Sequence, residues 1–283
     1  MSLLDNLIES AKAKGARVVF PEWEDPRVAE ACKQLAVQGI CTPIPLSDPS
    51  ERHVAALVET RGLKPAIAKR MLSKPLYRAA AMVAVGDADA MVAGADSPTK
   101  RVIEAAAIAI GLQEGVETPS SFFLMLLPDG RAQVFADCAV NVAPDASELA
   151  DIARASAASA RALLGEARVA LLSYSTGASG VGDSVERVRA AAVDTGFLGP
   201  IQADAALNAV IAGKKGLGDG DANVLIFPSL DAGNIAYKLL QELGGAQALG
   251  PFLQGFRKPV CDLSRGASVE DIVAATAVTV AMT

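Results

Sequence analysis

The sequence predicts a mixed α/β protein with mostly parallel strands, and three observations lead to this. Short β-branched and apolar runs alternate with longer amphipathic stretches, the pattern of strand–helix–strand units. The chain has 283 residues, enough for two α/β lobes that each bury a core. Apolar residues make up 51% and charged residues 20%, which is typical of folded and not of disordered chains.

Elements of the first half follow from apolar spacing. Asp25 is suited to cap a helix that has Pro26 in its first turn. Helices are expected from the 3.6-residue period over Leu3–Lys14, Pro26–Val37, Lys64–Leu72, Tyr77–Val85 and Thr99–Ile110. Strands are expected over Arg17–Phe20, Ile44–Leu46, Ala90–Ala93, Ser121–Leu127 and Ala132–Asp137. The turn Pro128–Gly130 joins the last two strands as a hairpin.

The second half repeats the alternation. Helices are expected over Ser147–Leu164, Val185–Val193, Ala203–Val210, Gly233–Leu243 and Val269–Ala281. Strands are expected over Val169–Ser173, Val224–Phe227 and Pro259–Cys261. Looser connectors lie at Thr118–Ser120 and Lys214–Asp221. We therefore expect two lobes, one formed by residues 1–118 with 250–283 and the other by residues 119–249.

Composition excludes several classes of function. The net charge of −6 and the 4% of aromatic residues disfavour nucleic-acid binding. His53 is the only histidine, which rules out zinc sites built on several histidines. The four cysteines form no CxxC pair, so we expect buried thiols in a reducing, cytoplasmic setting: Cys32, Cys41, Cys138 and Cys261. No apolar stretch approaches the ~20 residues of a membrane span, and the first residues do not resemble a signal peptide.

The first candidate site is the loop after the strand Ala90–Ala93. Ser97 can cap a helix that begins with Pro98, and the hydroxyl of Thr99 and the cation of Arg101 lie in the first turn. Free backbone N–H groups at a helix N-terminus attract anions, so this loop predicts an anion site. An ordinary capped helix with solvated cations is the alternative.

The second candidate site is the run of glycines and hydroxyls over Leu172–Ser184. Its N–H groups are suited to cradling a phosphate or a carbonyl oxygen. The run lacks both the lysine of a P-loop and the GxGxxG spacing, so a mobile loop explains it equally well.

The third candidate site lies over Lys258–Asp271. Arg265 is a bidentate donor for an anion, Ser264 adds a hydroxyl, and Asp271 is a candidate base. Ser268 stands three residues before Asp271, which is close to a capping box, so a purely structural role for Asp271 is the alternative.

The third segment, KPVCDLSRG followed by SVEDIV, resembles the C-terminal signature of the phosphate acetyl/butyryltransferase family. Further segments agree in the same order along nearly the whole chain: PEWEDPR at 21–27, LSYST at 172–176, QADAA at 202–206, NVLIFPSLDAGNIAYK at 223–238 and GPFLQGFRKP at 250–259.

The resemblance implies an acyltransferase that moves an acetyl group between coenzyme A and inorganic phosphate, with acetyl-CoA, phosphate and acetyl phosphate as substrates. It implies no metal, no cofactor and no covalent intermediate. It further implies a fold like that of the isocitrate and isopropylmalate dehydrogenases, with two α/β lobes, a cleft between them, and a homodimer. The family's catalytic residues fall on Ser264, Arg265 and Asp271, with Asp271 as base for the thiol. Substrate-binding positions fall on Ser97, Thr99, Arg101, Arg61, Ser173, Tyr174, Ser175, Thr176 and Asn234.

Two departures from the family keep alternatives open. Glu104 stands where the family has an arginine, and Arg101, one turn earlier, is expected to supply the cation. Gly177 replaces a lysine. These departures favour a module that senses acetyl-CoA without catalysis as a rival function. A preference for butyryl or another short acyl group is the other rival, and it depends on the size of the acyl pocket.

The thiol and the proposed base are poorly matched as free groups. The thiol has a pKa of ~8.5 and the carboxyl a pKa of ~3.9. Moving the proton from the thiol to the carboxylate is therefore unfavourable by roughly 6 kcal/mol. Either the thiolate is stabilised, or Arg265 binds the phosphate and pairs with Asp262 in the free enzyme.

Overall fold

The computed structural model describes residues 2–283 and divides into two compact units. The first unit comprises residues 1–115 and 250–283, and the second comprises residues 116–249. The domain limits expected from the sequence, 118/119 and 249/250, stay a prediction, and each unit is described by itself.

The first unit is a mostly parallel sheet in the strand order β2-β1-β3-β10-β9. Its strands are β1 (Arg17–Val19), β2 (Thr42–Ile44), β3 (Ala90–Ala93), β10 (Val260–Asp262) and, from residue 250 onward, β9 (Gln247–Gln254). Its helices are α1 (Leu3–Lys14), α2 (Pro26–Val37), α3 (Glu51–Arg61), α4 (Pro65–Leu72), α5 (Pro75–Ala84), α6 (Thr99–Ala109) and α12 (Val269–Ala281). β9 runs antiparallel to β10, and the other pairs are parallel.

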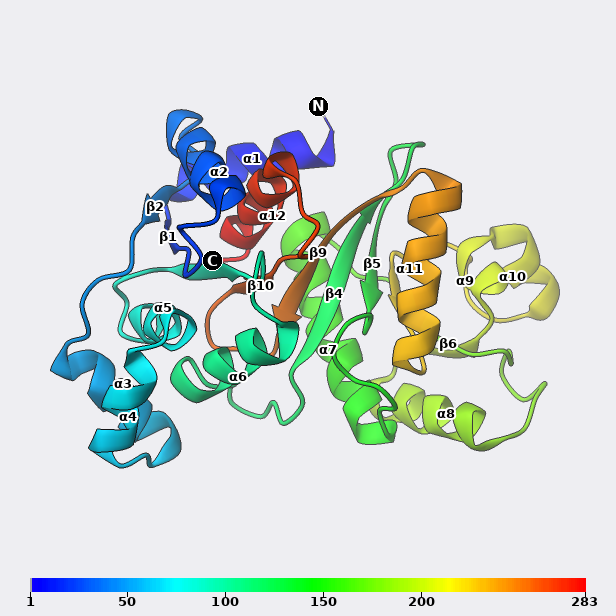
Figure 1. Cartoon of the computed structure of the whole chain (residues 1–283). Helices are drawn as coiled ribbons and strands as arrows, with labels where there is room; N and C mark the ends of the chain where they lie inside the picture. The colour runs from blue at the N-terminus through cyan, green and yellow to red at the C-terminus, as the bar shows by residue number, and fades with distance from the viewer. Residues whose placement is uncertain (1) are drawn as a thin grey trace. The chain divides into compact units, whose positions relative to one another are not determined.

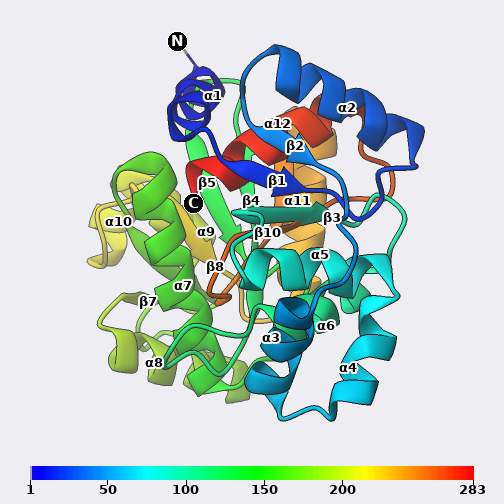
Figure 2. The same ribbon diagram turned by 90° about the vertical axis from the view of Figure 1, so that its left-hand side faces the viewer.

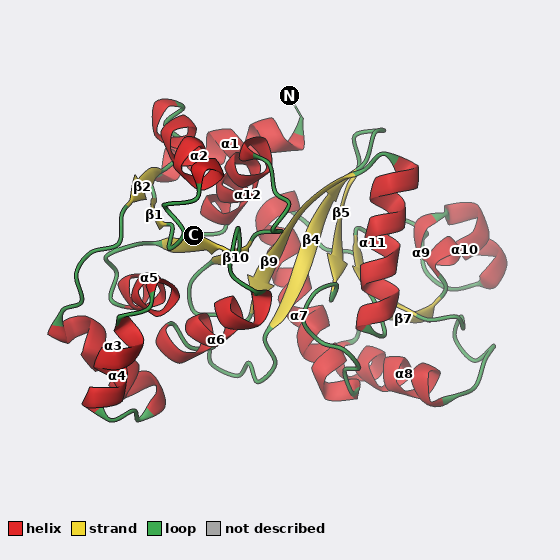
Figure 3. Ribbon diagram, in the orientation of Figure 1, coloured by secondary structure: helices red, strands yellow, loops and turns green. Residues whose placement is uncertain are grey.

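Helices cover both faces of this sheet. α1, α2 and α12 pack together on one face, and α3 to α6 gather on the other (Figure 1, Figure 3). The helix α12 is apolar nearly all round and is buried from Ile272 to Ala281, as expected for a helix inside the layers. All four residues of β3 are buried, which explains its continuous apolar sequence.

The second unit has the strand order β4-β5-β8-β6-β7. Its strands are β4 (Ser120–Leu126), β5 (Ala132–Ala136), β6 (Val169–Leu172), β7 (Leu198–Ile201) and β8 (Val224–Ile226). Its helices are α7 (Ala146–Leu164), α8 (Asp183–Thr195), α9 (Ala203–Leu207), α10 (Ala209–Lys215) and α11 (Leu230–Gly244). The antiparallel pair β4 and β5 confirms the predicted hairpin, and the remaining pairs are parallel.

One hydrophobic cluster of the second unit lies on the side of the sheet that carries α9 and α11. Phe123 of β4 stacks on Tyr237 of α11 with ring centroids 4.1 Å apart, and Phe135 and Phe227 pack near them. α7 and α8 pack together against the other side (Figure 1).

Two local expectations were wrong, and three elements were not expected. The edge strand β2 lies over Thr42–Ile44 and not Ile44–Leu46. The expected helix Ala203–Val210 is broken because the Asn208 side chain accepts hydrogen bonds from Val210 and Ile211 and so begins a new helix. The helix α3, seen beside α4 in Figure 2, and the strands β7 and β9 were not predicted. α3 has little amphipathic pattern, and its buried His53 joins the capping of its first turn.

The cysteines are buried free thiols, as predicted: Cys32, Cys41, Cys138 and Cys261. No helix within residues 2–283 is both long and apolar enough to cross a membrane.

Candidate active site

Three loops of the first unit meet at the edge where β1, β3 and β10 end. These strands are parallel neighbours, so their carboxyl ends lie at the same edge of the sheet. The loops lead into α2, α6 and α12, and they carry the first and third candidate sites of the sequence.

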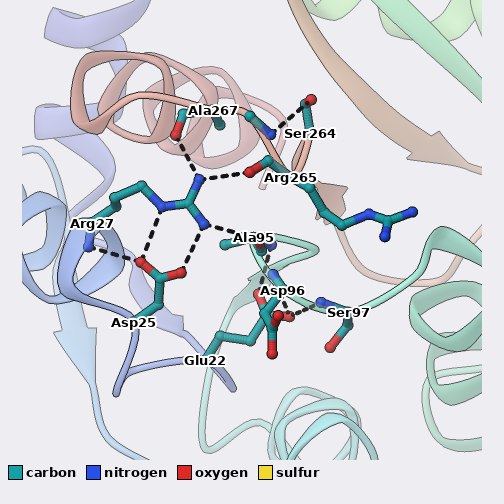
Figure 4. A network of polar contacts seen from close by, with 10 residues as sticks. Glu22, Asp25, Arg27, Ala95, Asp96, Ser97, Ser264, Arg265 and Ala267 are labelled. Carbon is teal, nitrogen blue, oxygen red and sulfur yellow. Dashed lines mark hydrogen bonds and ion pairs between the residues drawn. The ribbon is translucent and has the colours of Figure 1, made fainter.

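The Arg27 side chain ties the three loops together (Figure 4). Its guanidinium pairs with Asp25 at 2.7 Å, and the hydrogen bond between them holds the pKa of that carboxyl below its usual value. Its NH1 donates to the backbone carbonyls of Arg265 at 2.7 Å and Ala267 at 3.0 Å. Its NH2 also donates to the carbonyl of Ala95 at 2.9 Å. The Arg27 side chain thus joins its own segment to Ala95, 68 residues away, and to Arg265, 238 residues away.

The Glu22 carboxylate fills the backbone nest of the β3–α6 loop (Figure 4). It accepts N–H bonds from Ala95 at 2.7 Å, Asp96 at 3.2 Å and Ser97 at 2.7 Å. Successive N–H groups that converge in this way form an anion-binding concavity. The predicted anion geometry therefore exists, but part of it already holds a carboxylate of the protein itself.

The start of α6 corrects the predicted cap. Pro98 is the N-cap residue, the helix begins at Thr99, and the Ser97 side chain does not cap it. Among the described residues, no acceptor bonds the N–H of Thr99 or of Lys100, so these two donors point from a positive helix end without a partner. The candidate anion site is thus shorter than the sequence predicted, and it consists of the free N–H groups in the first turn of α6.

The β10–α12 loop presents Ser264 and Arg265 on the surface. The hydroxyl of Ser264 accepts the N–H of Gly266 at 3.3 Å, and both side chains are exposed. Within residues 2–283 the Arg265 guanidinium forms neither a hydrogen bond nor an ion pair, and in Figure 4 it points away from Arg27. It is therefore a free bidentate donor at this edge of the sheet.

Asp271 combines a capping role with a free oxygen. It forms a capping box in which its Oδ2 accepts from the Ser268 N–H at 3.0 Å and the Ser268 hydroxyl at 2.9 Å, while its own N–H donates back at 3.1 Å. Its Oδ1 has no hydrogen-bond partner in the described part of the chain. The two roles predicted for Asp271, helix cap and base, are thus compatible. One carboxyl oxygen caps the helix and the other is free to accept a proton.

Asp262 does not pair with Arg265, so that expectation was wrong. The Asp262 side chain is 1% exposed, and neither carboxyl oxygen has a hydrogen-bond partner among the described residues. Burial, together with the negative charge of Glu22, raises the pKa of Asp262 to about 7, although the Thr99 hydroxyl acts in the opposite direction.

Arg101 is not the free cation that the sequence led us to expect. Its NH1 pairs with Glu104 at 2.8 Å, and the same carboxylate accepts the Tyr77 hydroxyl at 2.8 Å. These bonds, that of Tyr77 first, lower the pKa of Glu104, while burial and the bond to Glu104 raise the pKa of Tyr77 to about 12. Glu104 thus partly neutralises the cation that stands one turn before it.

A pocket of about 920 Å³ opens beside the first turn of α6. Trp23 and Tyr77 supply apolar surface, and the polar groups are of both charges: the cations Lys74 and Arg101, the Ser97 hydroxyl, and the carboxylates of Glu22, Glu24, Asp25 and Asp96. Such a mixture of aromatic walls and a few polar groups suits a small-molecule ligand. Within residues 2–283 no three histidine, cysteine or carboxylate side chains gather as a metal site would require.

Arg61 lies apart from this first turn. Its Nε donates to the carbonyl of Ala107 at 3.1 Å, and Ala107 follows Thr99 by eight residues, or about 12 Å along a helix. The structure therefore does not bring Arg61 to the anion site at the start of α6.

The predicted loop of the second unit is held by its own hydroxyls. Ser175 is buried and accepts the Gly180 N–H at 2.8 Å, and Thr176 donates to Gln202 at 3.1 Å. The Ser173 hydroxyl accepts the Ser175 N–H at 3.2 Å. Tyr174 is 62% exposed, and its hydroxyl donates to the Val181 carbonyl. These hydroxyls shape the loop, and their contact with substrate stays a prediction.

Asn234 is likewise engaged in the structure. Its amide donates to the carbonyl of Cys138 at 3.1 Å at the start of α11. The preceding residue must be glycine, because a Cβ on Gly233 would lie 2.3 Å from the Asp137 carbonyl oxygen. Close packing of α11 thus explains Gly233, and a substrate role for Asn234 stays a prediction.

The family profile described as phosphate acetyl/butaryl transferase matches residues 2–55 and 50–280. The chain belongs to this family. It is 39% identical to a phosphate acetyltransferase of Paracoccus denitrificans over 317 residues, covering 100% of both chains. Its structure is similar to a phosphotransacetylase from Streptococcus pyogenes with a TM-score of 0.92 and 33% identity, covering 99% of this chain and 97% of the other. These matches confirm the resemblance and the α/β fold predicted from the sequence.

Other phosphate acetyltransferases are longer. The relative in Nitrosomonas europaea is 41% identical over 312 residues, which is 96% of this chain but 45% of that protein. The chain thus spans about half the length of several of the curated relatives it matches and the whole length of the one in Paracoccus denitrificans.

Sequence reasoning missed three residues that shape this candidate site. Glu22 and Arg27 lie in the segment PEWEDPR, which was noted for its resemblance without a role. Asp262 was considered only as a partner of Arg265. The sequence does show that charged residues follow the end of a buried strand. This pattern places them at the edge of the sheet, but it does not indicate which loop they contact.

Proposed function

We propose that the protein transfers an acetyl group between coenzyme A and inorganic phosphate. The family match carries this proposal, since the matched residues 2–55 and 50–280 contain all the loops described above. Two relatives that are 41% and 39% identical to this chain are named phosphate acetyltransferase. An open anion site with a free arginine beside a carboxylate supports the same chemistry.

The residues of the first unit suit the two demands of this reaction. The phosphate group is a dianion, and the N–H groups of Thr99 and Lys100 with the Arg265 guanidinium can bind it. The thiol of coenzyme A has to lose its proton to attack the acyl carbonyl, and Asp271 Oδ1 is the open acceptor. Because a carboxylate is a weak base toward a thiol, positive charge near the sulfur must stabilise the thiolate.

A transfer that prefers butyryl or another short acyl group is the nearest rival. A second rival is a module that binds acetyl-CoA without turnover, and the pairing of Glu104 with Arg101 favours it because that pairing partly neutralises a cation that lines the pocket. A cytoplasmic homodimer that uses acetyl-CoA, phosphate and acetyl phosphate, without a metal or other cofactor, completes the proposal.

A coupled assay separates these functions. Acetyl-CoA formation from acetyl phosphate and coenzyme A is measured beside the same reaction with butyryl phosphate. A higher kcat/KM for acetyl phosphate supports the proposal, and a higher value for butyryl phosphate replaces it by the nearest rival. Tight binding of acetyl-CoA with no turnover of either substrate would establish the sensing module instead.

Freeing Arg101 is expected to improve the use of acyl phosphate. In Glu104→Gln the amide oxygen still accepts the Tyr77 hydroxyl, but the ion pair with Arg101 is lost. The KM for acetyl phosphate should fall, while Arg101→Ala should raise it roughly 10- to 100-fold, the range for a charge-assisted contact. The KM for coenzyme A should change little in both variants.

A matched control is Lys33→Ala, which removes an exposed cation that pairs with Glu30 on α2 in the same i, i+3 spacing. Its KM for acetyl phosphate should equal that of the wild type. An unchanged KM in Arg101→Ala would show that this cation does not bind the phosphate group.

A further inference from the structure

The Asp262 carboxyl is sealed against the loop that leads into α6. It ends β10, is 1% exposed, and is followed by Leu263, whose N–H donates to the Ala93 carbonyl at 2.6 Å. A Cβ on Gly94 would lie 2.5 Å from Asp262 Oδ1 and 2.6 Å from the Leu263 nitrogen. The backbone φ of Gly94 is +102°, so glycine is required there for conformation as well as for space. The carboxyl therefore presses directly on the backbone of the anion-binding loop.

No ion pair among the described residues compensates this buried carboxyl, and of the neighbouring groups only the Thr99 hydroxyl acts to lower its pKa. Both of its oxygens lack a hydrogen-bond partner within residues 2–283, and it belongs to none of the ion pairs there. Buried polar groups are almost always paired, so an unpaired carboxyl beside a ligand site requires an explanation.

Charges around Asp262 come from four directions. β3 and β9 carry no titratable side chain. The remaining neighbours carry these titratable groups: Glu22 before α2, Asp96 in the β3–α6 loop, Cys261 on the same strand, Arg265 in the β10–α12 loop, Lys100, Arg101 and Glu104 on α6, and Glu270 and Asp271 on α12. Burial is the main cause that raises the pKa of Asp262 to about 7, and of these groups Glu22 adds to that effect by its negative charge. Asp262 in turn helps to raise the pKa of the buried Cys261 thiol.

An anion at the start of α6 would add negative charge next to Glu22 and Asp262. The two unpartnered N–H groups of Thr99 and Lys100 attract such an anion. A buried ionised carboxyl would repel it, because charge interactions in a dry interior are weakly screened. The conflict disappears when Asp262 carries a proton.

We propose that Asp262 is a positioning residue of this anion site, which takes up one proton from solvent when a phosphate-bearing substrate binds at the start of α6. As a neutral acid it donates its O–H to the Thr99 hydroxyl oxygen, and the Thr99 hydrogen is then free for the anion. Asp262 itself forms no bond to substrate. This role depends on the proposed acyl transfer in one respect only, which is that acetyl phosphate is the phosphate-bearing substrate.

The proton uptake has a definite pH dependence. Below about pH 7 Asp262 is already neutral, so anion binding changes nothing there. Above about pH 7 it is ionised in the free protein, and the affinity for the anion should fall about tenfold per pH unit. Asp262→Asn places a neutral group of the same shape at this position and removes this dependence.

Enzyme kinetics test the proposal in the full-length protein. The kcat/KM for acetyl phosphate is measured from about pH 6 to about pH 9 in the wild type, in Asp262→Asn, and in Glu270→Gln, which removes one exposed carboxylate from α12. The ratio of Asp262→Asn to wild type cancels the titration of the thiol, which both proteins share. This ratio should rise about tenfold between pH 8 and pH 9, and the ratio for Glu270→Gln should stay flat. A flat ratio for Asp262→Asn in an active enzyme would overturn the proposal.

Calorimetry tests the proton directly and does not need turnover. Sulfate, which stays a dianion throughout this pH range, is titrated into the wild type in two buffers of different ionisation enthalpy. About 0.9 proton should be taken up per sulfate at about pH 8 and about 0.1 at about pH 6, as a pKa of about 7 requires. Asp262→Asn should take up none at either pH.

The outcomes separate the two proposals. Absence of proton uptake by the wild type at about pH 8, or absence of sulfate binding at about pH 6, overturns the role of Asp262 even if Asp262→Asn does not fold. Absence of acyl transfer with proton-linked sulfate binding retained overturns the enzymatic function and leaves the role of Asp262 standing.

Discussion

Asp271→Asn is expected to leave the fold intact and to lower kcat by about 10²- to 10⁴-fold, the usual contribution of a general base. Asparagine is as good a helix cap as aspartate, and its amide oxygen can accept the N–H and hydroxyl bonds of Ser268. It cannot take the thiol proton at the position of Oδ1. The measurement is kcat in the coupled assay together with the melting temperature of both proteins.

The neighbouring variant Glu270→Gln is the control for this experiment. Glu270 lies in the same first turn of α12 and its loss changes the net charge by the same amount. Its kcat should match that of the wild type. If Asp271→Asn also keeps the wild-type kcat at an unchanged melting temperature, Asp271 is a cap and not a base.

Arg27→Ala is expected to lower both stability and turnover. It removes the guanidinium that bonds the carbonyls of Ala95, Arg265 and Ala267 and leaves Asp25 without its partner. Hydrogen bonds to charged groups contribute roughly 1.5–3 kcal/mol each, and their losses are not additive, so we expect a decrease of about 2–4 kcal/mol in the free energy of unfolding. Turnover should fall by about 10²-fold at temperatures where the protein is folded, because Arg265 is then no longer held in place.

Arg17→Ala provides the matched control. Arg17 also pairs with an aspartate, Asp89, and also donates to a backbone carbonyl, that of Gly86, but it lies at the start of β1. Its side chain is 45% exposed, and such pairs contribute about 0–1 kcal/mol. Urea unfolding and kcat at a fixed temperature are compared for both variants. Equal kcat losses in the two would mean that Arg27 acts only on global stability.

The candidate site was visible in the sequence at the level of its loops. A buried strand followed by small residues and a helix start predicted the β3–α6 loop, and the DLSRG segment predicted the β10–α12 loop. The spacing of Ser268 and Asp271 predicted the capping box that the structure contains. These features depend on residues within a few positions of one another, so local patterns are sufficient to find them.

The partners of these residues were beyond the reach of such patterns. Arg101 and Glu104 are three residues apart, but the third member, Tyr77, comes from α5 and engages Glu104 from 27 residues away. Glu22 bonds the β3–α6 loop from 73 to 75 residues away. Whether a cation or an N–H group is free for a ligand depends on such distant partners.

The sequence by itself determined the α/β class, the position of most helices and strands, the family, and the loops that carry the candidate catalytic residues. Periodicity, caps and contiguous motifs encode these properties because each arises within one element or one loop. The tertiary structure alone decided that Glu22 fills the backbone nest, that Arg27 joins three loops, and that Asp262 is buried without a partner. These three facts depend on which strand ends meet at one edge of the sheet, and burial from water, which sets the charge state of Asp262, exists only after the chain has folded.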